Sequence, residues 1–355
     1  GGAPYLHTLI STVPTAANAG YYAGIVAEKA LLRRLVEAGT RVLSSIVASQ
    51  QEVHEQFGGV VPEVACRAHV EAVLPVIRRA LEVAAVPIDR IDAVAVTTTP
   101  GLIGALLVGV TAAKSLSWAL DVPLVAVNHL HAHAYAAWLS DEPPELPAVT
   151  LVVSGGHTSL FRTDGPIEHS LLGSTVDDAA GEAFDKVAHI LGLGYPGGPA
   201  IERAAAGGRP DAVSFPRSML RSGNANFSFS GLKTAVLYHC VGPNASREDI
   251  EGAVYEPSFV ADVAAAFQEA VVDVLAAKAC AAARQEGVRT LIVGGGVAAN
   301  GRLRERLAAE ADALGLALRL APRRLCTDNA AMIAGVACPM LRAGRTAPLT
   351  VEAVP

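Results

Sequence analysis

The sequence predicts a layered α/β fold, and three observations support this expectation. From about Val42 onward, short apolar segments bounded by Gly and Pro alternate with longer segments rich in helix-forming residues. Hydrophobic residues make up 51% of the chain, and 33 Gly and 21 Pro interrupt it, as in globular enzymes. The length of 355 residues is sufficient for two domains with a substantial core. In such folds, ligand sites form at strand ends, where loops converge.

The predicted elements follow one another in a regular order around a polar, Pro-rich linker at 140–147, where we place a subdomain boundary. Before the linker the pattern indicates a buried strand at 91–101, a helix at 102–120 and a strand at 122–128. After it, the segment AVTLVVSGGHTSLFR predicts a hairpin that turns at Gly155-Gly156. The remaining predicted elements are helices at 177–193 and 257–287, a strand at 290–296, a helix at 300–315, a strand at 316–322 and a helix that opens near 326.

Residues 1–41 differ in character from the rest of the chain. Thr15 can cap a helix there, and no strand signal accompanies it. The formal net charge of −6 argues against a pervasive nucleic-acid-binding surface. A local stripe of arginines is either a solvated helix face or a phosphate contact; it consists of Arg302, Arg304, Arg306, Arg323 and Arg324. Five scattered cysteines without CxxC spacing, and no uninterrupted apolar run of membrane-spanning length, favour a reduced, soluble, cytoplasmic protein without membrane association.

The segment NHLHAHAYAAW, at 128–138, carries three histidines at alternate positions. If it is a strand, His129, His131 and His133 share one face. If a helix begins there, only His129 and His133 do, because each residue advances by about 100°. Asn128 is a good helix cap, which favours the helix and a metal-binding pair. Two imidazoles need a carboxylate to complete a metal site, and Asp328 is one candidate among many.

Three glycine-rich elements are suited to binding anions through backbone N–H groups: SGGHT at 154–158, YPGGP at 195–199 and GGGVAAN at 294–300. Together they favour a nucleotide, although none has the spacing of a P-loop or of a dinucleotide-binding motif. In the acidic segment 177–186, Glu182 and Lys186 are spaced as a helical ion pair. The segment FSFSGLKTA, at 227–235, is interpreted either as plain loop structure or as part of the site.

These motifs in order resemble the catalytic subunit family of tRNA threonylcarbamoyladenosine synthases. The resemblance begins at about Val42 and rests on FGGVVPEVACRAHV, PGLIGALLVG, NHLHAH, LVVSGGHTSL, DDAAGEAFDK, YPGGP, FSFSGLKTA, GGGVAAN and CTDNAAMIA. It implies two ribonuclease-H-like subdomains of the actin, sugar-kinase and Hsp70 type. The first would comprise 42–147 with 322–355 and bind a metal; the second, 148–321, would bind nucleotide and substrate.

The same resemblance implies an acyltransferase that moves a threonylcarbamoyl group from threonylcarbamoyl-AMP to N6 of adenosine 37, in tRNAs that read codons beginning with A. It implies one divalent metal per subunit, usually assigned to iron, on His129, His133 and Asp328, with His131 not a ligand. The implied partners are tRNA, an inactive paralogous subunit and a small ATPase. The implied substrate-binding residues are Val152, Val153, Ser154, Gly155, Gly156, Asp185, Gly198 and Asn300.

The resemblance does not extend to the first residues of the chain. Residues 1–40 are similar instead to part of the helical N-terminal domain of a replicative DNA helicase, and the strand and phosphate-contacting turn that open family members are not seen. We therefore expect a first subdomain without its N-terminal hairpin, which would leave a sheet edge open. An inactive fused module for nucleotide binding or protein interaction stays open as an alternative. A metalloprotease is a minor alternative, because no Glu adjoins the first histidine as in HExxH.

Overall fold

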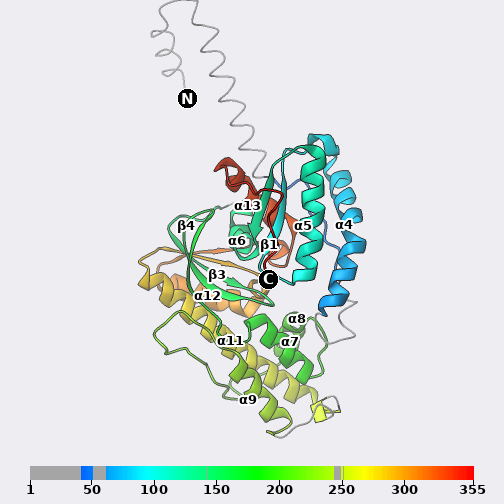
Figure 1. Ribbon diagram of the computed structural model, residues 1–355. Coiled ribbons are helices and arrows are strands. Elements are labelled where there is room, and N and C mark those ends of the chain that lie inside the picture. The colour runs from blue at the N-terminus through cyan, green and yellow to red at the C-terminus, as the bar shows by residue number, and fades with distance from the viewer. Residues whose placement is uncertain (1–40, 51–60, 141, 244–248, 251) are drawn as a thin grey trace, which may run out of the picture. The chain divides into compact units, whose positions relative to one another are not determined.

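The computed structural model describes residues 41–50, 61–140, 142–243, 249–250 and 252–355 (Figure 1). The chain divides into two compact units, 1–42 and 43–355, and the second contains every element described below. The predicted N-terminal helix and the helicase-like segment fall on residues outside the described part, apart from position 41. They stay predictions.

The described elements alternate between strands and helices, as the sequence predicts. The strands are β1 (Val94–Thr99), β2 (Leu124–Asn128), β3 (Ala148–Val153), β4 (Thr158–Gly165), β5 (Glu168–Ser174), β6 (Thr290–Gly294) and β7 (Ala317–Leu320). The α-helices are α4 (Pro62–Ala84), α5 (Ile103–Leu120), α6 (His129–Tyr135), α7 (Ala180–Ile190), α8 (Gly197–Ala205), α9 (Ser230–Cys240), α11 (Pro257–Gln285), α12 (Gly301–Ala313) and α13 (Ala330–Arg342). Short 3-10 turns are η2 (Ile88–Arg90), η3 (Ala136–Leu139), η4 (Gly296–Ala299) and η5 (Arg323–Leu325).

The first layer contains a two-stranded parallel sheet, in which β1 pairs with β2. Helix α5 connects the two strands and packs against β1, and α4 packs against α5 (Figure 1). Helix α4 begins at Pro62, where the missing N–H costs nothing because the first N–H groups of a helix are unpaired anyway. It ends where Ala85 adopts a left-handed conformation with φ 53°. The layer therefore places the carboxyl end of β2 at the start of α6.

The second layer is a five-stranded mixed sheet with the order β5-β4-β3-β6-β7. Strands β3, β4 and β5 are antiparallel, whereas β6 and β7 run parallel to β3. The predicted hairpin at Gly155-Gly156 is confirmed, because Val153 pairs with Thr158 across the turn. Both β3 and β6 are buried along their whole length, as expected for strands covered on both faces. Their carboxyl ends lie side by side at one edge.

Helices cover both faces of this sheet. On one face lies α11, a long helix of Ala, Val and Leu that contacts β3, β6, α8 and α12. On the other face α6 and η3 pack, through Ala134 against Val152 and Phe161, and through Ala137 against Ala148 and Ile292. Helix α13 packs in turn against α6, β1 and β2. Helix α6 is thus held between the two sheets.

The two sheets take their strands from opposite sides of the predicted linker at 140–147, and the subdomain boundaries themselves stay a prediction. The segment 227–235 is part loop and part helix, since α9 begins at Ser230. All five cysteines lie in the described residues and are free thiols.

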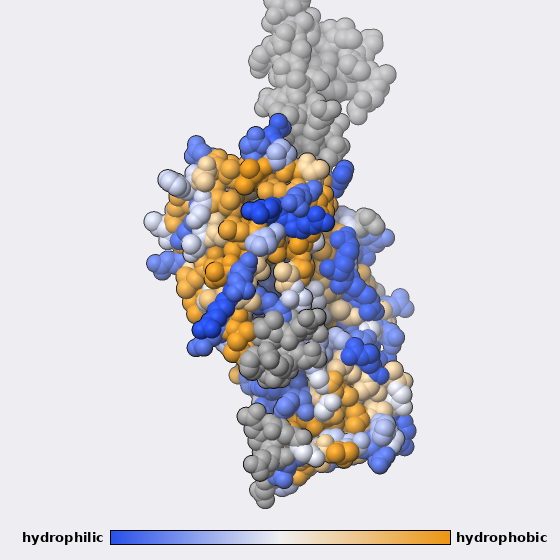
Figure 2. Space-filling view, turned by 90° about the vertical axis from the view of Figure 1, so that its right-hand side faces the viewer, coloured by the Kyte–Doolittle hydropathy of each residue, from blue (hydrophilic) through white to orange (hydrophobic). Residues whose placement is uncertain are grey.

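A wide apolar surface covers the side of the molecule that carries α4 and α5 (Figure 2). Its exposed members include Val70 and Leu74 of α4, and Leu107 and Trp118 of α5; the Trp118 residue is 76% exposed. Helix α5 has a mean hydropathy of 1.5 over 18 residues and is only 22% buried, so by length and composition alone it could cross a membrane. It packs against α4 and β1 and contains Lys114, as a helix of a soluble α/β layer does.

Candidate metal centre and substrate loops

The histidine segment forms a helix that starts directly at the end of β2. The side-chain oxygen of Asn128 accepts hydrogen bonds from the backbone N–H groups of Leu130 and His131, at 2.9 and 3.3 Å. This confirms the predicted cap and the helical alternative for the segment. His129 and His133 therefore share one face. His131 points elsewhere, and its ring centroid lies 4.6 Å from that of His169 on β5.

Asp328 is held immediately before α13 by the cap of that helix. The side-chain oxygen of Asn329 accepts a hydrogen bond from the N–H of Met332, at 2.9 Å. Its amide donates to the carbonyl oxygens of Thr327 at 2.8 Å and Leu325 at 3.3 Å. One asparagine thus ties both sides of Asp328 into a fixed turn.

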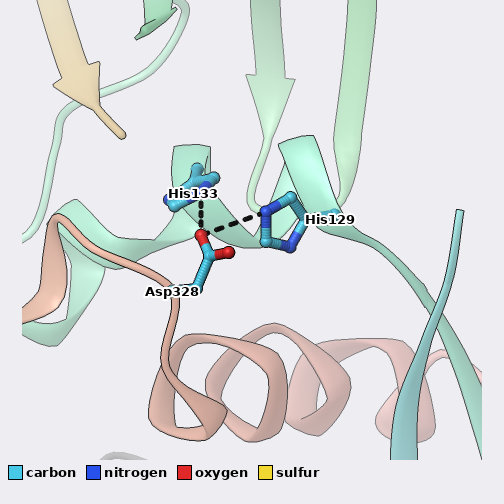
Figure 3. A group of neighbouring side chains, drawn as sticks. All are labelled: His129, His133 and Asp328. Carbon is cyan, nitrogen blue, oxygen red and sulfur yellow. Dashed lines mark ion pairs between the residues drawn. The ribbon is translucent and has the colours of Figure 1, made fainter. Parts of the chain in front are cut away.

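The two histidines and Asp328 converge, although they lie far apart in the sequence (Figure 3). Asp328 Oδ1 lies 3.3 Å from Nε2 of His129 and 3.2 Å from Nε2 of His133. The two imidazole rings are 4.6 Å apart and nearly perpendicular. One ligand atom from each of the three residues lies within 4.8 Å of the others, the only such group of His, Cys, Asp or Glu in the part of the chain that the structure describes.

These side chains fit a metal ion. His133 is fully buried, and neither of its ring nitrogens has a hydrogen-bond partner of acceptable geometry, even though Nε2 is within ion-pair distance of Asp328. Leaving a buried polar atom unpaired costs about 1–3 kcal/mol, which a bound cation would offset. Two imidazoles and one carboxylate are the donor set of iron(II) and zinc sites that keep positions open for substrate. Asp328 is 79% exposed, so the cluster is open on its side.

The charges of the cluster support the same conclusion. Burial lowers the pKa of His133, so its imidazole is neutral and can donate a lone pair at pH 7. For Asp328, desolvation raises the pKa, and the hydrogen bonds and charges of the two histidines lower it well below its usual range. The two imidazoles together outweigh the desolvation, so the net direction is downward and the carboxylate is ionised near neutral pH.

The SGGHT loop lies beside this cluster. Burial lowers the pKa of His157, and the charges of His129 and His133 lower it further, which places its ring within electrostatic range of them. Sequence reasoning did not select His157. His157 follows two glycines at the carboxyl end of a buried strand, and this position could have marked it as a candidate site residue. In the described residues no Glu belongs to the ligand cluster itself.

The residues expected to bind substrate lie mostly at the same edge of the second sheet. Val152 and Val153 end β3 and are fully buried, Ser154 is buried, and Gly155 and Gly156 are open on their Cβ side. The loop after β6 approaches this edge closely. A Cβ on Gly295 would collide with the carbonyl of Val153, and its φ of 97° also requires glycine.

Helix α7 links the first glycine-rich loop to the second. The N–H of Gly181 donates to the carbonyl of Ser154 at 3.3 Å. In the middle of the helix, Asp185 accepts a hydrogen bond from the N–H of Gly197 at 2.7 Å, at the start of α8. Burial raises the pKa of Asp185, which this hydrogen bond partly counteracts. Gly198, the next residue, has open space where a Cβ would lie.

The third glycine-rich loop is closed by polar contacts. Asn300 caps α12 through Leu303 N at 2.9 Å, and its amide donates to Gln268 at 2.8 Å. Glu202 of α8 accepts from the N–H of Gly301 at 2.7 Å. Sequence reasoning missed Glu202, because nothing in the sequence connects it to a glycine that lies 99 positions later.

The acidic segment 177–186 serves the structure. Glu182 and Lys186 form the predicted ion pair at 2.8 Å, and Asp178 pairs with Lys186 at 2.9 Å and Lys233 at 3.1 Å. Asp177 accepts from Ser228, Ser230 and the N–H of Phe229. Of the acidic set, Asp185 contacts a glycine-rich loop, through the N–H of Gly197.

The arginine stripe is mostly occupied within the protein. Arg302 pairs with Glu269 at 2.7 Å, and Arg306 with Glu310 at 2.7 Å and Asp273 at 3.2 Å. Arg323 donates to the carbonyl of Ala299. These contacts account for three of the guanidinium groups in the stripe, those of Arg302, Arg306 and Arg323.

Comparison with known proteins decides the family. A model of the tRNA N6-adenosine threonylcarbamoyltransferase family, TsaD, matches residues 41–335. The chain belongs to the TsaD family. A tRNA N6-adenosine threonylcarbamoyltransferase from Symbiobacterium thermophilum is 52% identical over 323 residues, or 90% of this chain and 91% of the relative. One from Syntrophobacter fumaroxidans is 54% identical over 303 residues, or 85% and 88%.

Solved structures support the fold of this TsaD-family chain. HypF from T. kodakarensis matches with a TM-score of 0.56 at 17% identity, over 77% of this chain and 44% of HypF. A full-length HypF in a phosphate- and nucleotide-bound form matches with a TM-score of 0.52 at 16% identity, over 77% and 42%. The expectation of an actin, sugar-kinase and Hsp70 type of α/β fold is confirmed.

Proposed function

We propose that this chain transfers the threonylcarbamoyl group of threonylcarbamoyl-AMP to N6 of adenosine 37, in tRNAs that read codons beginning with A. The observation that carries the proposal is the position of the His129, His133 and Asp328 cluster beside the SGGHT loop. This arrangement supports a Lewis-acid site next to backbone N–H groups suited to a phosphate. The membership of the TsaD family supports the same activity.

The chemistry needs few groups from the protein. The donor is a mixed carbamic–phosphoric anhydride, so the exocyclic amine of adenosine attacks the carbonyl carbon, a new C–N bond forms, and the bond to the phosphate oxygen of AMP breaks. His129, His133 and Asp328 would hold a divalent ion, which would supply charge stabilisation to the carbonyl or phosphoryl oxygens. The SGGHT loop would offer the N–H groups of Gly155 and Gly156 to the anion, because the N–H of Ser154 already donates to the carbonyl of His157. No covalent enzyme nucleophile is required.

We infer that the remaining expected residues position the donor. Asp185 and Gly198 lie at the junction of α7 and α8, and Asn300 fixes the start of α12. Val152 and Val153 anchor the SGGHT loop in the core. We propose Fe²⁺ as the metal, one ion per subunit, which the donor set accepts alongside Zn²⁺.

The test is t6A formation, measured by mass spectrometry of nucleosides from digested tRNA, with metal content measured in parallel. We expect modified tRNA from the wild-type chain with its partner subunits, and a loss of at least about 100-fold in both His133→Ala and Asp328→Asn. His131→Ala is the matched control and should keep its metal, because its ring faces His169. Bound nucleotide without any product would favour a non-catalytic module. A larger loss of metal in His131→Ala than in His133→Ala would contradict the helical ligand pair.

We also propose tRNA, an inactive paralogous subunit and a small ATPase as partners in the cytoplasm. The apolar surface of α4 and α5 supports a partner chain, because exposed patches that include Val70, Leu74, Leu107 and Trp118 are characteristic of interaction sites (Figure 2). We assign that surface to the paralogous subunit.

A further inference from the structure

The guanidinium of Arg304 connects two loops that otherwise belong to different parts of the site. Arg304 lies in the first turns of α12 and is partly buried. Its Nε donates to the carbonyl oxygen of Ala298 at 2.6 Å, and its Nη2 donates to the carbonyl oxygen of Ala321 at 2.7 Å. The same Nη2 lies 3.3 Å from Sγ of Cys326.

Each of these partners has a definite place. Ala298 is in η4, within the glycine-rich GGGVAAN loop that follows β6. Ala321 directly follows β7. Cys326 is fully buried and precedes the metal-cluster residue Asp328 by one intervening residue. Its Sγ also contacts the carbonyl oxygens of Ala321 and Pro322 at 3.6 and 3.5 Å.

We propose that Arg304 is a positioning residue that couples the GGGVAAN loop to the Asp328 turn, so that nucleotide binding and metal binding strengthen each other. The inference rests on the proposed function, because it takes the glycine-rich loop as part of a nucleotide site. A shift of η4 moves the carbonyl of Ala298. Because Arg304 is hydrogen-bonded to that carbonyl, its guanidinium moves too and displaces Ala321 and Cys326. The turn that carries Asp328 then changes its distance from His129 and His133.

The contacts require arginine specifically. The guanidinium has a rigid planar fork with five donors, whereas lysine has a single ammonium on a flexible stem. Lysine at position 304 keeps the positive charge but cannot bond Ala298, Ala321 and Cys326 in one fixed geometry. The variant Arg304→Lys therefore separates the geometry of the connection from its charge.

Arg306 provides a matched control on the same helix. Its partners are the carboxylates of Glu310 at 2.7 Å, Asp273 at 3.2 Å and Glu269 at 3.7 Å, and none of them lies in either loop. Arg306→Gln removes ion pairs of α12 without touching the connection. A general weakening of α12 would affect both variants alike.

The experiment measures the affinity for Fe²⁺, under anaerobic conditions, with and without saturating AMP. In the wild-type chain we expect AMP to tighten Fe²⁺ binding, and Fe²⁺ to tighten AMP binding by the same factor. In Arg304→Lys we expect Fe²⁺ to bind about 10-fold more weakly, as for other residues that orient ligands, and the AMP effect to vanish. Arg306→Gln should retain the wild-type affinity for Fe²⁺ and the effect of AMP on it. Thermal unfolding of each metal-free variant reports stability separately.

Two outcomes overturn the inference alone. One is a wild-type chain that binds both ligands without coupling; the other is an Arg304→Lys variant that keeps the coupling, or loses it no more than Arg306→Gln does. If the affinity for Fe²⁺ is unchanged in His133→Ala, the proposed metal site is wrong, and this inference is wrong with it.

Discussion

The imidazoles of His129 and His133 and the carboxylate of Asp328 depend on one another. His133 is buried without hydrogen-bond partners, and Asp328 holds its negative charge because two imidazoles face it. Without a metal, one carboxylate oxygen of Asp328 lies between the two imidazole nitrogens and bonds neither well. A metal ion would bond directly to all three groups. Since ligands must be deprotonated, the lowered pKa of His133 keeps this residue available for metal at pH 7.

His169 gives a prediction for stability against pH. Burial, and next the charge of His131, lower the pKa of His169 to about 4 from 6.5. Below pH 6.5 the unfolded chain therefore binds a proton at this residue that the folded chain does not, so stability falls as the pH drops from about 6.5 to about 4. The shift corresponds to at most about 3 kcal/mol.

The measurement is urea unfolding between pH 4 and 7. His169→Gln should flatten the pH dependence in this window, whereas substitution of the exposed His189 by Gln should leave it as in the wild type. If the free energy of unfolding changes with pH equally in the wild type and in His169→Gln, His169 is not buried in its neutral form.

Among the elements, α6 was predictable and its metal partner was not. The helix follows from Asn128, a local cap whose hydrogen bonds are made within three residues. Asp328 approaches α6 from almost 200 positions away, through the packing of α13 on α6, and no local pattern encodes such a contact. Its choice rested on the family resemblance. The roles of Glu202 and Arg304 were invisible for the same reason, because their partners are backbone atoms of distant loops.

The close approach of the two loops at the carboxyl ends of β3 and β6 gives a prediction at the same scale. Gly295 has a φ of 97°, and a Cβ there would meet the carbonyl of Val153. Gly295→Ala should therefore destabilise the protein by about 1–3 kcal/mol and weaken AMP binding. Gly296→Ala is the control, since no atom lies within 4 Å of its Cβ position, and it should change stability by less than about 0.5 kcal/mol.

Chemical denaturation of both variants, with AMP titrations, tests this account of the loops. If Gly296→Ala lowers the stability as much as Gly295→Ala does, the close approach to Val153 is not what requires glycine at position 295.

For the whole molecule, the alternation of strands and helices predicted the α/β fold, and the resemblance to a family predicted its type. The large apolar surface of α4 and α5 was not predicted. Helical periodicity distinguishes the apolar side of a helix, but not whether that side faces the same chain or another one. Val70 and Leu74 look like core residues in the sequence, yet they are 61% and 62% exposed.

Trp118 tests the assignment of this surface to the paralogous subunit. Because it is 76% exposed, Trp118→Ser should change the stability of the isolated chain by less than about 0.5 kcal/mol. It should weaken binding of the paralogous subunit by about 2 kcal/mol or more, or roughly 30-fold, as buried interface tryptophans do. Tyr238→Ser, an exposed position on α9, should leave binding unchanged. Isothermal titration calorimetry measures the affinity for the paralogous subunit. If Trp118→Ser and Tyr238→Ser change this affinity equally, the interface does not lie on α4 and α5.

The most direct test of the central claim follows the threonylcarbamoyl group itself. Threonylcarbamoyl-AMP labelled in its threonine is incubated with the chain, its partner subunits and a tRNA that carries adenosine 37, or the same tRNA with guanosine 37. We predict label in the adenosine 37 tRNA, none in the guanosine 37 tRNA, and none in either with Asp328→Asn. Equal labelling of the two tRNAs, or label that persists in Asp328→Asn, would contradict transfer to N6 of adenosine 37 at this metal site.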